Sequence, residues 1–504
     1  MTATPLTTLA TPTDWRERAR SLTLETRAFI GGQYRPARGG QTFARVNPAT
    51  GKHLADITAC QEVDIDDAVQ AARAAFESGV WRDRSPLERK TTLLRFAELI
   101  RQNAEELALL ETLDTGKAIG ETTRVDAHSL ARDVQWYAES IDKLYDEIAP
   151  NGVGTLVLVT REAVGVVAAV VPWNYPLIIA GWKLGPALAA GNSVILKPAE
   201  QSSLGAIRLG ALGLEAGLPQ GVFQVTPGLG SVAGRALGLH PDVDAIGFTG
   251  STEVGRKFLE YSAASNLKRV GLELGGKSAQ IVTPDADLDR AAMYVAYGIW
   301  YNQGETCNAG SRLIVHESVR EALLDKLRPW AEKLAPGDPL EHGSPLGSLI
   351  DEAHLEKVLE YVRLGVQEGA RVVIGGKRTL EGSGGAFMQN TVLDGATNTM
   401  RVAREEIFGP VLVVISYTEL DEAVRLANDS DYGLAAAVWS RNLSTAHKVA
   451  RRLRAGTVWV NSFDHTSVNA PFGGYKQSGH GRDKSLHAFD KYTELKTTWI
   501  ELYE

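Results

Sequence analysis

One cysteine lies in a segment that suits a nucleophile. Cys307 occurs in NQGETCNAGSR, where small and polar residues flank it on both sides. Such neighbours allow a reactant to approach the sulfur, and a thiolate can attack a carbonyl carbon. The alternative is a small buried hydrophobic residue, which is the commoner use of a lone cysteine. The setting of Cys307 therefore favours covalent chemistry and leaves the second reading open.

One glutamate lies where its pKa would suit a general base. Glu273 occurs in GLELGGKSAQ, between Leu272 and Leu274. Partial burial between two apolar residues would raise the pKa of its carboxyl group towards the useful range. The alternative is a carboxylate at a strand end, paired with Lys277 or a nearby arginine.

An asparagine could stabilise negative charge on a reacting oxygen. Asn174 lies in VVPWNYPL between two prolines that stiffen the backbone. A rigidly held amide NH2 can donate to a developing oxyanion. An asparagine here could also simply cap the helix that starts after Pro176.

Two segments could bind a nucleotide. Residues 247–255, GFTGSTEVG, are predicted to run from a strand into a helix, with small residues and free N–H groups where a phosphate can bind. The spacing of Gly250 and Gly255 is not GxGxxG, so the usual dinucleotide fingerprint is absent. In NSVILKPAE, Lys197 and Glu200 follow a predicted strand, at the edge where open α/β sheets bind ligands. An acid there suits ribose hydroxyls, and a surface salt bridge is the alternative.

The elements that must position these residues form two series. From about residue 156, and again from Ser278, short β-branched runs alternate with helical segments; the runs include VGVVAAVV, NSVILKP, GVFQV, DAIGF, SAQIV, RLIV, VLVVISY and TVWVN. This alternation predicts parallel sheets covered by helices on both faces, and strands that are apolar throughout agree with burial on both faces. The predicted fold class is therefore α/β, with two doubly wound parallel-sheet domains and the chemistry where they meet.

Local signals mark elements in the first part of the chain. RAFIGGQYR is typical of a hairpin. Ser85 to Glu88 form a capping box with proline at the first helical position, and Asn103 can cap the next helix, which Gly116 ends.

Composition excludes several classes of protein. The 504 residues carry a net charge of -8, and without a dense basic cluster this makes nucleic acid an unfavourable partner. No apolar run has membrane-spanning length, and the N-terminal residues lack the apolar core of a leader, so we expect no membrane association and a cytoplasmic location. Only two cysteines and scattered histidines without HExxH indicate a reducing compartment and no metal site.

The chain resembles the aldehyde dehydrogenase superfamily from about Phe29 to Leu502. The segments that carry the resemblance, in the family's order, are PWNYP, WKLGPALAAGNSVILKPAE, FTGSTEVG, LELGGKSAQIV, NQGETCNAGSR, EEIFGPVL and PFGGYKQSGHGRDKSLHAFDKYTELK. The resemblance implies that Cys307 is the nucleophile, that Glu273 activates the thiol or the deacylating water, and that Asn174 and the Cys307 N–H form the oxyanion hole. An aldehyde would be oxidised to an acid through a thioester.

The resemblance also implies a cofactor site for NAD, with NADP as an alternative. Lys197 and Glu200 would bind the adenine ribose, Gly250 and Ser251 the pyrophosphate, and Glu406 and Phe408 the nicotinamide ribose and ring. The remaining residues assigned to this site by motif are Trp173, Gly230, Phe248, Val254 and Leu274. NAD is favoured because Glu200 would repel a 2′-phosphate, although Lys197 could offset this repulsion.

By the same analogy, the chain divides into three parts. Residues 1–142 and 164–275 would form the NAD(P)-binding domain, residues 276–480 the catalytic domain, and residues 143–163 and 481–504 a small β oligomerisation element. The C-terminal strand predicts edge pairing in a homo-oligomer, either a dimer or a tetramer.

The resemblance extends to a bacterial subgroup through GRDKSLHAF. This subgroup acts on γ-glutamyl-γ-aminobutyraldehyde and similar ω-aminoaldehydes, which makes such a compound the expected substrate. The substrate tunnel is expected to be lined by Tyr175, Ile179, Trp182, Tyr301, Asp464, Thr466 and Phe472, with His465 near its mouth. Asp464 could attract a cationic amine, whereas the aromatic walls suit an aryl or aliphatic aldehyde.

One position departs from the family's pattern. Leu486 occupies the place where many relatives carry a second glutamate, which puts a proton relay through that position in doubt.

Two other classes of function remain as alternatives. A CoA-acylating dehydrogenase or cysteine acyltransferase is disfavoured because Glu273 is retained, and a non-catalytic relative is disfavoured because Cys307, Glu273 and Asn174 are all present.

Overall fold

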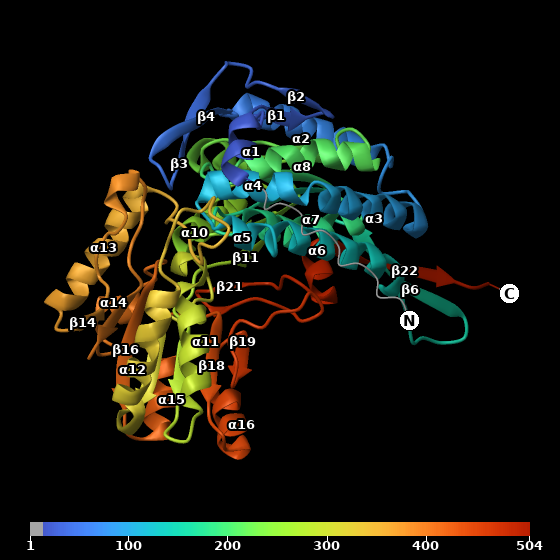
Figure 1. Cartoon of the computed structure of the whole chain (residues 1–504). Helices are drawn as coiled ribbons and strands as arrows, with labels where there is room; N and C mark the ends of the chain where they lie inside the picture. Colours follow the sequence, from blue (N-terminus) through green and yellow to red (C-terminus); the bar gives the residue numbers. More distant parts are fainter. Residues whose placement is uncertain (1–13, 504) are drawn as a thin grey trace, which may run out of the picture.

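The computed structural model describes residues 14–503 and contains two large sheets with helices on both faces of each (Figure 1). This is the predicted α/β class with two doubly wound sheets, and a smaller three-stranded sheet extends from the body. The sequence predicts no leader at the N-terminus. Residues 1–13, which make up most of that segment, lie outside the described residues.

The first part of the chain contains the predicted local elements. The Gly31–Gly32 turn, with positive φ at both residues, connects the hairpin strands. Ser85 and Glu88 form the reciprocal capping box at the start of α3. Contrary to the prediction, Asn103 does not cap α4 with its side chain. Its Nδ2 donates to the Leu99 carbonyl, and its Oδ1 accepts from Arg208. The elements are α1 (Trp15–Ser21), β1 (Ala28–Ile30), β2 (Gln33–Arg35), β3 (Thr42–Asn47), β4 (Lys52–Thr58), α2 (Glu62–Glu77), α3 (Pro86–Gln102), α4 (Ala104–Thr115), α5 (Ile119–Thr122) and α6 (Asp126–Ser140).

The first large sheet has the strand order β2-β1-β9-β8-β7-β10-β11-β21. Its central strands β9, β8, β7, β10 and β11 are parallel. The chain proceeds from β7 towards β9 and then returns to the other side of β7, which creates a topological switch point between β7 and β10. The elements are β7 (Val166–Val170), α7 (Pro176–Ala189), β8 (Ser193–Lys197), α8 (Leu204–Ala216), β9 (Phe223–Val225), α9 (Arg235–Leu239), β10 (Ala245–Thr249), α10 (Thr252–Ala263), β11 (Arg269–Glu273) and β21 (Gly479–His480).

Alternate residues of β7 enter different cores, as expected for a strand covered on both faces. Val167 and Ala169 pack with α3, α6, α7 and α8, whereas Val166, Ala168 and Val170 pack with α2 and α10. Both cores hold the sheet rigidly, so that the carboxyl ends of its strands can position side chains.

The second large sheet has the order β14-β15-β16-β13-β12-β18-β19 and is parallel except for the edge strand β14. Helices α11 and α12 cover one face, and α13, α15 and α16 cover the other. The elements are β12 (Ala279–Val282), α11 (Leu288–Trp300), β13 (Arg312–His316), α12 (Glu317–Lys333), α13 (Glu352–Gln367), β14 (Arg371–Ile374), β15 (Thr391–Asp394), α14 (Arg401–Arg404), β16 (Val411–Tyr417), α15 (Leu420–Asn428), β18 (Ala435–Trp439), α16 (Leu443–Arg452) and β19 (Thr457–Val460).

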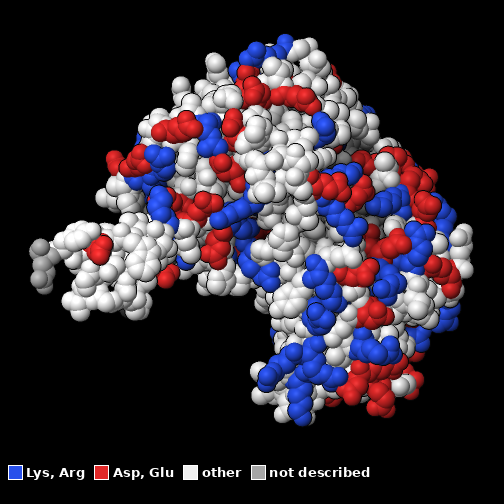
Figure 2. Space-filling model, turned by 180° about the vertical axis from the view of Figure 1, so that it is seen from behind, with Lys and Arg blue, Asp and Glu red and all other residues white. Residues whose placement is uncertain are grey.

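A three-stranded antiparallel arm projects from the body beside the C-terminus (Figure 1). It consists of β5 (Glu147–Ala149), β6 (Thr155–Ala163) and β22 (Thr493–Glu501), with β22 at one edge. Its surface is largely uncharged in Figure 2, and its exposed apolar side chains include Ile148, Leu495 and Trp499.

Candidate active site

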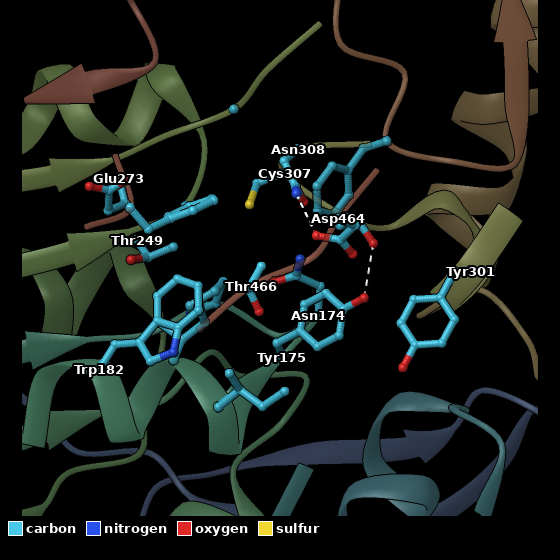
Figure 3. Close-up of a pocket in the computed structure, with 18 of the residues that line it drawn as sticks. Asn174, Tyr175, Trp182, Thr249, Glu273, Tyr301, Cys307, Asn308, Asp464 and Thr466 are labelled. Atoms are coloured by element: carbon cyan, nitrogen blue, oxygen red, sulfur yellow. Dashed lines mark hydrogen bonds between the residues drawn. The ribbon is translucent and has the colours of Figure 1, made fainter. Parts of the chain in front are cut away.

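A cavity of about 740 Å³ lies between the two large sheets. It brings together Cys307, Glu273 and Asn174, which come from three separate segments of the chain. Figure 3 shows the Cys307 sulfur and the Asn174 amide turned towards the same space, with Glu273 at its edge. The cavity therefore contains a thiol, a carboxylate and an amide.

Cys307 lies in the loop after α11 and the short helix Tyr301–Gly304, and its side chain is partly exposed. Burial in protein raises the pKa of the thiol well above its usual value, and the carboxylates Glu273 and Glu406 raise it further. The thiol is therefore protonated at neutral pH, and a base must remove its proton before the sulfur can attack.

Glu273 ends β11 and is only 4% exposed. Within residues 14–503, neither carboxylate oxygen has a hydrogen-bond partner. Burial raises the pKa of the carboxyl group well above 4.5, and the negative charge of Asp483 adds to this, whereas Lys183 and Lys491 oppose it. An unpartnered carboxylate with a raised pKa is a stronger base than an ordinary carboxylate.

Asn174 is held between β7 and α7 by contacts with the loop that carries Cys307. Its Nδ2 donates to the Glu305 carbonyl at 2.8 Å, and the Asn302 Nδ2 donates to the Asn174 carbonyl at 3.2 Å. The side chain makes no cap to α7, whose N-cap residue is Tyr175. The amide is therefore fixed relative to Cys307, and its second N–H remains available to an oxyanion.

The predicted cofactor residues divide into six that line the cavity and five that do not. Trp173, Gly250, Ser251, Leu274, Glu406 and Phe408 line the cavity. Lys197, Glu200, Gly230, Phe248 and Val254 lie outside its lining. The Phe248 side chain is buried in the core against Phe258, with the ring centroids 4.8 Å apart, so this side chain is not available to a ligand in the cavity.

Several features of this region fit a dinucleotide. Ser251 caps α10, whose N-terminus offers free N–H groups for phosphate. Thr249 has a buried hydroxyl without a partner among the described residues. Lys197 is buried at the end of β8, with the Glu200 carboxylate 3.5 Å from its Nζ, and burial lowers the pKa of the lysine. Polar groups are thus placed for both phosphate and ribose hydroxyls.

The nicotinamide end of such a cofactor would meet Glu406 and Phe408. In the structure, the Glu406 Oε1 accepts from the Gly276 N–H at 3.0 Å. Burial raises the pKa of Glu406 to about 7. The Phe408 ring packs edge-on against Trp173, with 5.2 Å between the centroids.

All seven predicted tunnel residues line the cavity: Tyr175, Ile179, Trp182, Tyr301, Asp464, Thr466 and Phe472. The first three follow one face of α7. Tyr175 and Thr306 hydroxyls are 3.0 Å apart, and the Asn308 Nδ2 donates to Asp464 at 2.8 Å (Figure 3). His465 lies outside the lining and packs against Tyr294.

Other cavity residues were missed by the sequence analysis. They include Val125, Ser129, Arg132, Asp133, Tyr294, Tyr297, Phe463 and Lys484. Asp133 lies on α6. In the sequence, the charged residues of this helix look like those of a helix face exposed to solvent. Lys484 lies within the GRDKSLHAF segment, and its charge is the signal that could have identified it.

The position that departs from the family's pattern does not face this site. Leu486 is 40% exposed and is absent from the cavity lining. The carboxylate near Glu273 is instead Asp483, which pairs with Lys183 and Lys491. The residue at position 486 therefore does not decide whether an acid lies near Glu273.

Two kinds of feature are absent from residues 14–503. Within this range, no group of three or more His, Cys, Asp or Glu residues is arranged to hold a metal ion. No helix in the described chain has both the length and the apolarity to cross a membrane.

Comparisons with known proteins find similarity over nearly the whole chain. The model of the aldehyde dehydrogenase family matches residues 34–498. The NADP/NAD-dependent aldehyde dehydrogenase PuuC of Escherichia coli (strain K12) is 51% identical over 97% of this chain and 98% of its own. A γ-glutamyl-γ-aminobutyraldehyde dehydrogenase structure from Burkholderia cenocepacia J2315 is 55% identical, with a TM-score of 0.96 over 97% of this chain and 99% of that one. An indole-3-acetaldehyde dehydrogenase in complex with NAD+ is 53% identical, with the same TM-score and coverage.

Proposed function

Because this chain belongs to the aldehyde dehydrogenase family, we propose that it oxidises an ω-aminoaldehyde to the acid through a thioester on Cys307. The chain is an NAD(P)-dependent aldehyde dehydrogenase. The observation that carries the proposed chemistry is the shared cavity of Cys307, Asn174 and the unpartnered carboxylate of Glu273. Retention of Glu273 favours water as the acyl acceptor over a thiol such as CoA.

The first step is the activation of the nucleophile. Glu273 takes the proton of the Cys307 thiol, directly or through a water molecule, and the thiolate attacks the aldehyde carbon. The Asn174 Nδ2 and the Cys307 backbone N–H donate to the resulting oxyanion. Because Asn174 is already fixed by the Glu305 carbonyl, it needs little reorganisation to stabilise this charge.

The later steps release the acid. When bound, NAD+ supplies the hydride acceptor that converts the thiohemiacetal on Cys307 to a thioester. Trp173, Phe408 and Glu406 would orient the nicotinamide end from one wall of the cavity. Glu273 first releases the thiol proton to solvent and then removes a proton from water, which attacks the thioester carbon. The carbon–sulfur bond breaks, so that the acid departs and the Cys307 thiolate is regenerated.

The substrate class rests on the relatives and on Asp464. The similar proteins include an enzyme named for γ-glutamyl-γ-aminobutyraldehyde and one named for aminoacetaldehyde. The Asp464 side chain is exposed to the cavity, where it can attract an amine. An aromatic aldehyde is the second candidate, because Tyr175, Trp182 and Phe472 form aromatic walls.

A substrate panel tests this choice. Initial rates of NAD+ reduction would be measured with γ-glutamyl-γ-aminobutyraldehyde, γ-aminobutyraldehyde, indole-3-acetaldehyde, benzaldehyde and hexanal. We expect the highest kcat/KM with an ω-amino compound. A highest value with an aryl or alkyl aldehyde would contradict the proposed substrate class and leave the thioester chemistry intact.

We propose NAD+ as the preferred cofactor, because Glu200 lies 3.5 Å from Lys197, where it would repel a 2′-phosphate. Glu200→Gln is expected to raise kcat/KM for NADP+ relative to NAD+ by about tenfold, since it removes a like charge. Glu215→Gln on the exposed face of α8 is the matched control. An unchanged ratio of the two kcat/KM values would show that Glu200 does not set cofactor preference.

We also propose that residues 1–142 and 164–275 form the cofactor domain, residues 276–480 the catalytic domain, and residues 143–163 and 481–504 an oligomerisation element. The last residues of the catalytic range form β21, which crosses over to pair with β11 of the first sheet, and Phe489 and Tyr492 of the last range pack in the core of that sheet. The free edge of β22 and its exposed Leu495 and Trp499 support self-association through the arm. Trp499→Asp is expected to shift the protein from a dimer or tetramer towards monomer in light scattering. Leu87→Asp, at an exposed site on α3, should leave the mass unchanged. A Trp499→Asp variant with wild-type mass would contradict this assignment.

A further inference from the structure

One buried lysine lines the cavity without an ion pair to any described carboxylate. Lys484 is 6% exposed. Within residues 14–503, Asp133, Asp464 and Asp483 influence its ammonium through charge alone, and none of them forms a hydrogen bond with it. Its ammonium lies 4.4 Å from the Trp182 ring centroid and 5.5 Å from that of Phe472. Aromatic rings stabilise a cation, but they leave its N–H donors without acceptors.

The backbone is constrained to direct this side chain into the cavity. Lys484 and Ser485 both have positive φ, at 60° and 51°, which non-glycine residues rarely adopt. On one side of Lys484, the backbone of Asp483 forms an antiparallel β-bridge with Phe472. On the other side, the Ser485 N–H donates to the Val468 carbonyl at 2.6 Å. The Tyr137 hydroxyl also donates to the Ser485 carbonyl. Strained backbone that is held by such contacts is characteristic of functional positions.

Two carboxylates lie near Lys484 without pairing with it. Asp133 is 1% exposed, and its Oδ2 has no hydrogen-bond partner among the described residues. Asp464 is exposed to the cavity and accepts one hydrogen bond, from Asn308. Both influence Lys484 through charge, yet neither bonds its ammonium, and Asp133 lies 4.0 Å from the Arg132 Nε instead. Lys484, Arg132, Asp133 and Asp464 thus place charges of both signs among the cavity-lining residues, which also include Glu273, Glu406 and Lys357.

This arrangement fits a ligand that carries both charges. A bare ammonium would meet Asp464 but would also be repelled by Lys484, whereas a carboxylate supplies the acceptors that the Lys484 ammonium lacks. We propose that Lys484 is a specificity-determining residue that binds the carboxylate of an α-amino acid group on the aldehyde substrate, with Asp464 or Asp133 receiving the ammonium. The inference rests on the proposed function and narrows its substrate class to aldehydes with a zwitterionic end.

The test uses two aldehydes that differ only in this carboxylate. They are γ-glutamyl-γ-aminobutyraldehyde and its decarboxylated analogue, the amide of 4-aminobutanoic acid with γ-aminobutyraldehyde. For the wild-type enzyme we expect kcat/KM to be higher for the carboxylated compound by roughly tenfold to a hundredfold, the range for a hydrogen bond to a charged group. Lys484→Met should abolish most of this ratio, and Lys484→Arg should restore part of it.

Two controls separate recognition from folding. Lys448→Met, at an exposed position on α16, should keep the wild-type ratio. Lys484→Met should also keep wild-type affinity for NAD+, and its Tm should not fall, since it removes an unpartnered buried charge. If Lys484 served only to stabilise the fold, Lys484→Met would instead lower the Tm and leave the ratio of the two kcat/KM values unchanged.

Each outcome has a separate meaning. The role of Lys484 is overturned if the wild type does not prefer the carboxylated compound, if it oxidises neither compound, or if Lys484→Met keeps the wild-type ratio. A different measurement tests the proposed substrate class. That class is wrong if, in the substrate panel, kcat/KM is higher for aryl or alkyl aldehydes than for ω-amino compounds.

Discussion

Cys307→Ala is expected to lower kcat for aldehyde oxidation by at least about 10⁴-fold, because removing the nucleophile of a covalent mechanism abolishes its acylation step. Cys307→Ser should be nearly as inactive, since a serine hydroxyl is far less easily deprotonated than a thiol. NAD+ affinity, measured by fluorescence titration, should persist in both variants because Cys307 lies in the loop after α11, away from the Lys197 end of the proposed cofactor site.

The other cysteine provides the matched control. Cys60 is fully buried in the core of the first sheet and is absent from the cavity lining. Cys60→Ala should therefore keep kcat near the wild-type value, with a modest loss of stability from the smaller side chain. Substantial NADH formation by Cys307→Ala would contradict the covalent mechanism.

Glu273→Gln is expected to lower kcat by roughly 10² to 10⁴-fold, the contribution of a positioned general base. Glutamine keeps the size of the side chain but cannot accept a proton. The loss should be large because the pKa of the Cys307 thiol is itself raised, so the nucleophile depends on the base. Hydrolysis of the thioester requires the same carboxylate, so both halves of the reaction should slow.

The pH profile gives a second readout. The basic form of Glu273 is required, and burial raises the pKa of its carboxyl group well above 4.5. In the wild type, kcat/KM should therefore increase with pH as Glu273 loses its proton, and it should fall as the pH is lowered through that pKa. In Glu273→Gln this limb should disappear, leaving only a rise at alkaline pH as Cys307 ionises.

A matched glutamate variant separates the effect of this base from a general effect of charge. Glu260→Gln on the exposed face of α10 should retain both kcat and the wild-type profile. A Glu273→Gln enzyme with the wild-type pH profile would show that another group is the base.

The three residues Cys307, Glu273 and Asn174, which share the cavity, could be predicted because each follows a recognisable local pattern. Glu273 ends an apolar strand, Asn174 lies between prolines before a helix, and Cys307 lies in a small polar loop. Parallel strands bring their carboxyl ends to one edge of a sheet, so strand ends and the loops that follow them meet there. The α/β class followed from the same alternation of strands and helices.

The charged residues of the cavity could not be predicted in this way. Asp133 is buried only because α6 packs against α7, and nothing in its own segment distinguishes it from a surface charge. Asp483 pairs with Lys183, a residue 300 positions earlier in the chain. Asn103 stands at a helix start, but Arg208 and the Leu99 carbonyl engage its side chain instead. In each case a long-range contact overrides the local pattern.

The most direct test of the covalent mechanism is the intact mass of the enzyme during turnover. Glu273→Gln would be mixed with NAD+ and aldehyde at alkaline pH, where Cys307 ionises without the base, then quenched with acid and analysed by mass spectrometry with peptide mapping. We expect an adduct on the Cys307 peptide equal to the mass of the aldehyde less two hydrogens, which identifies a thioester. NADH formation without any adduct on Cys307, or an adduct on another residue, would contradict it.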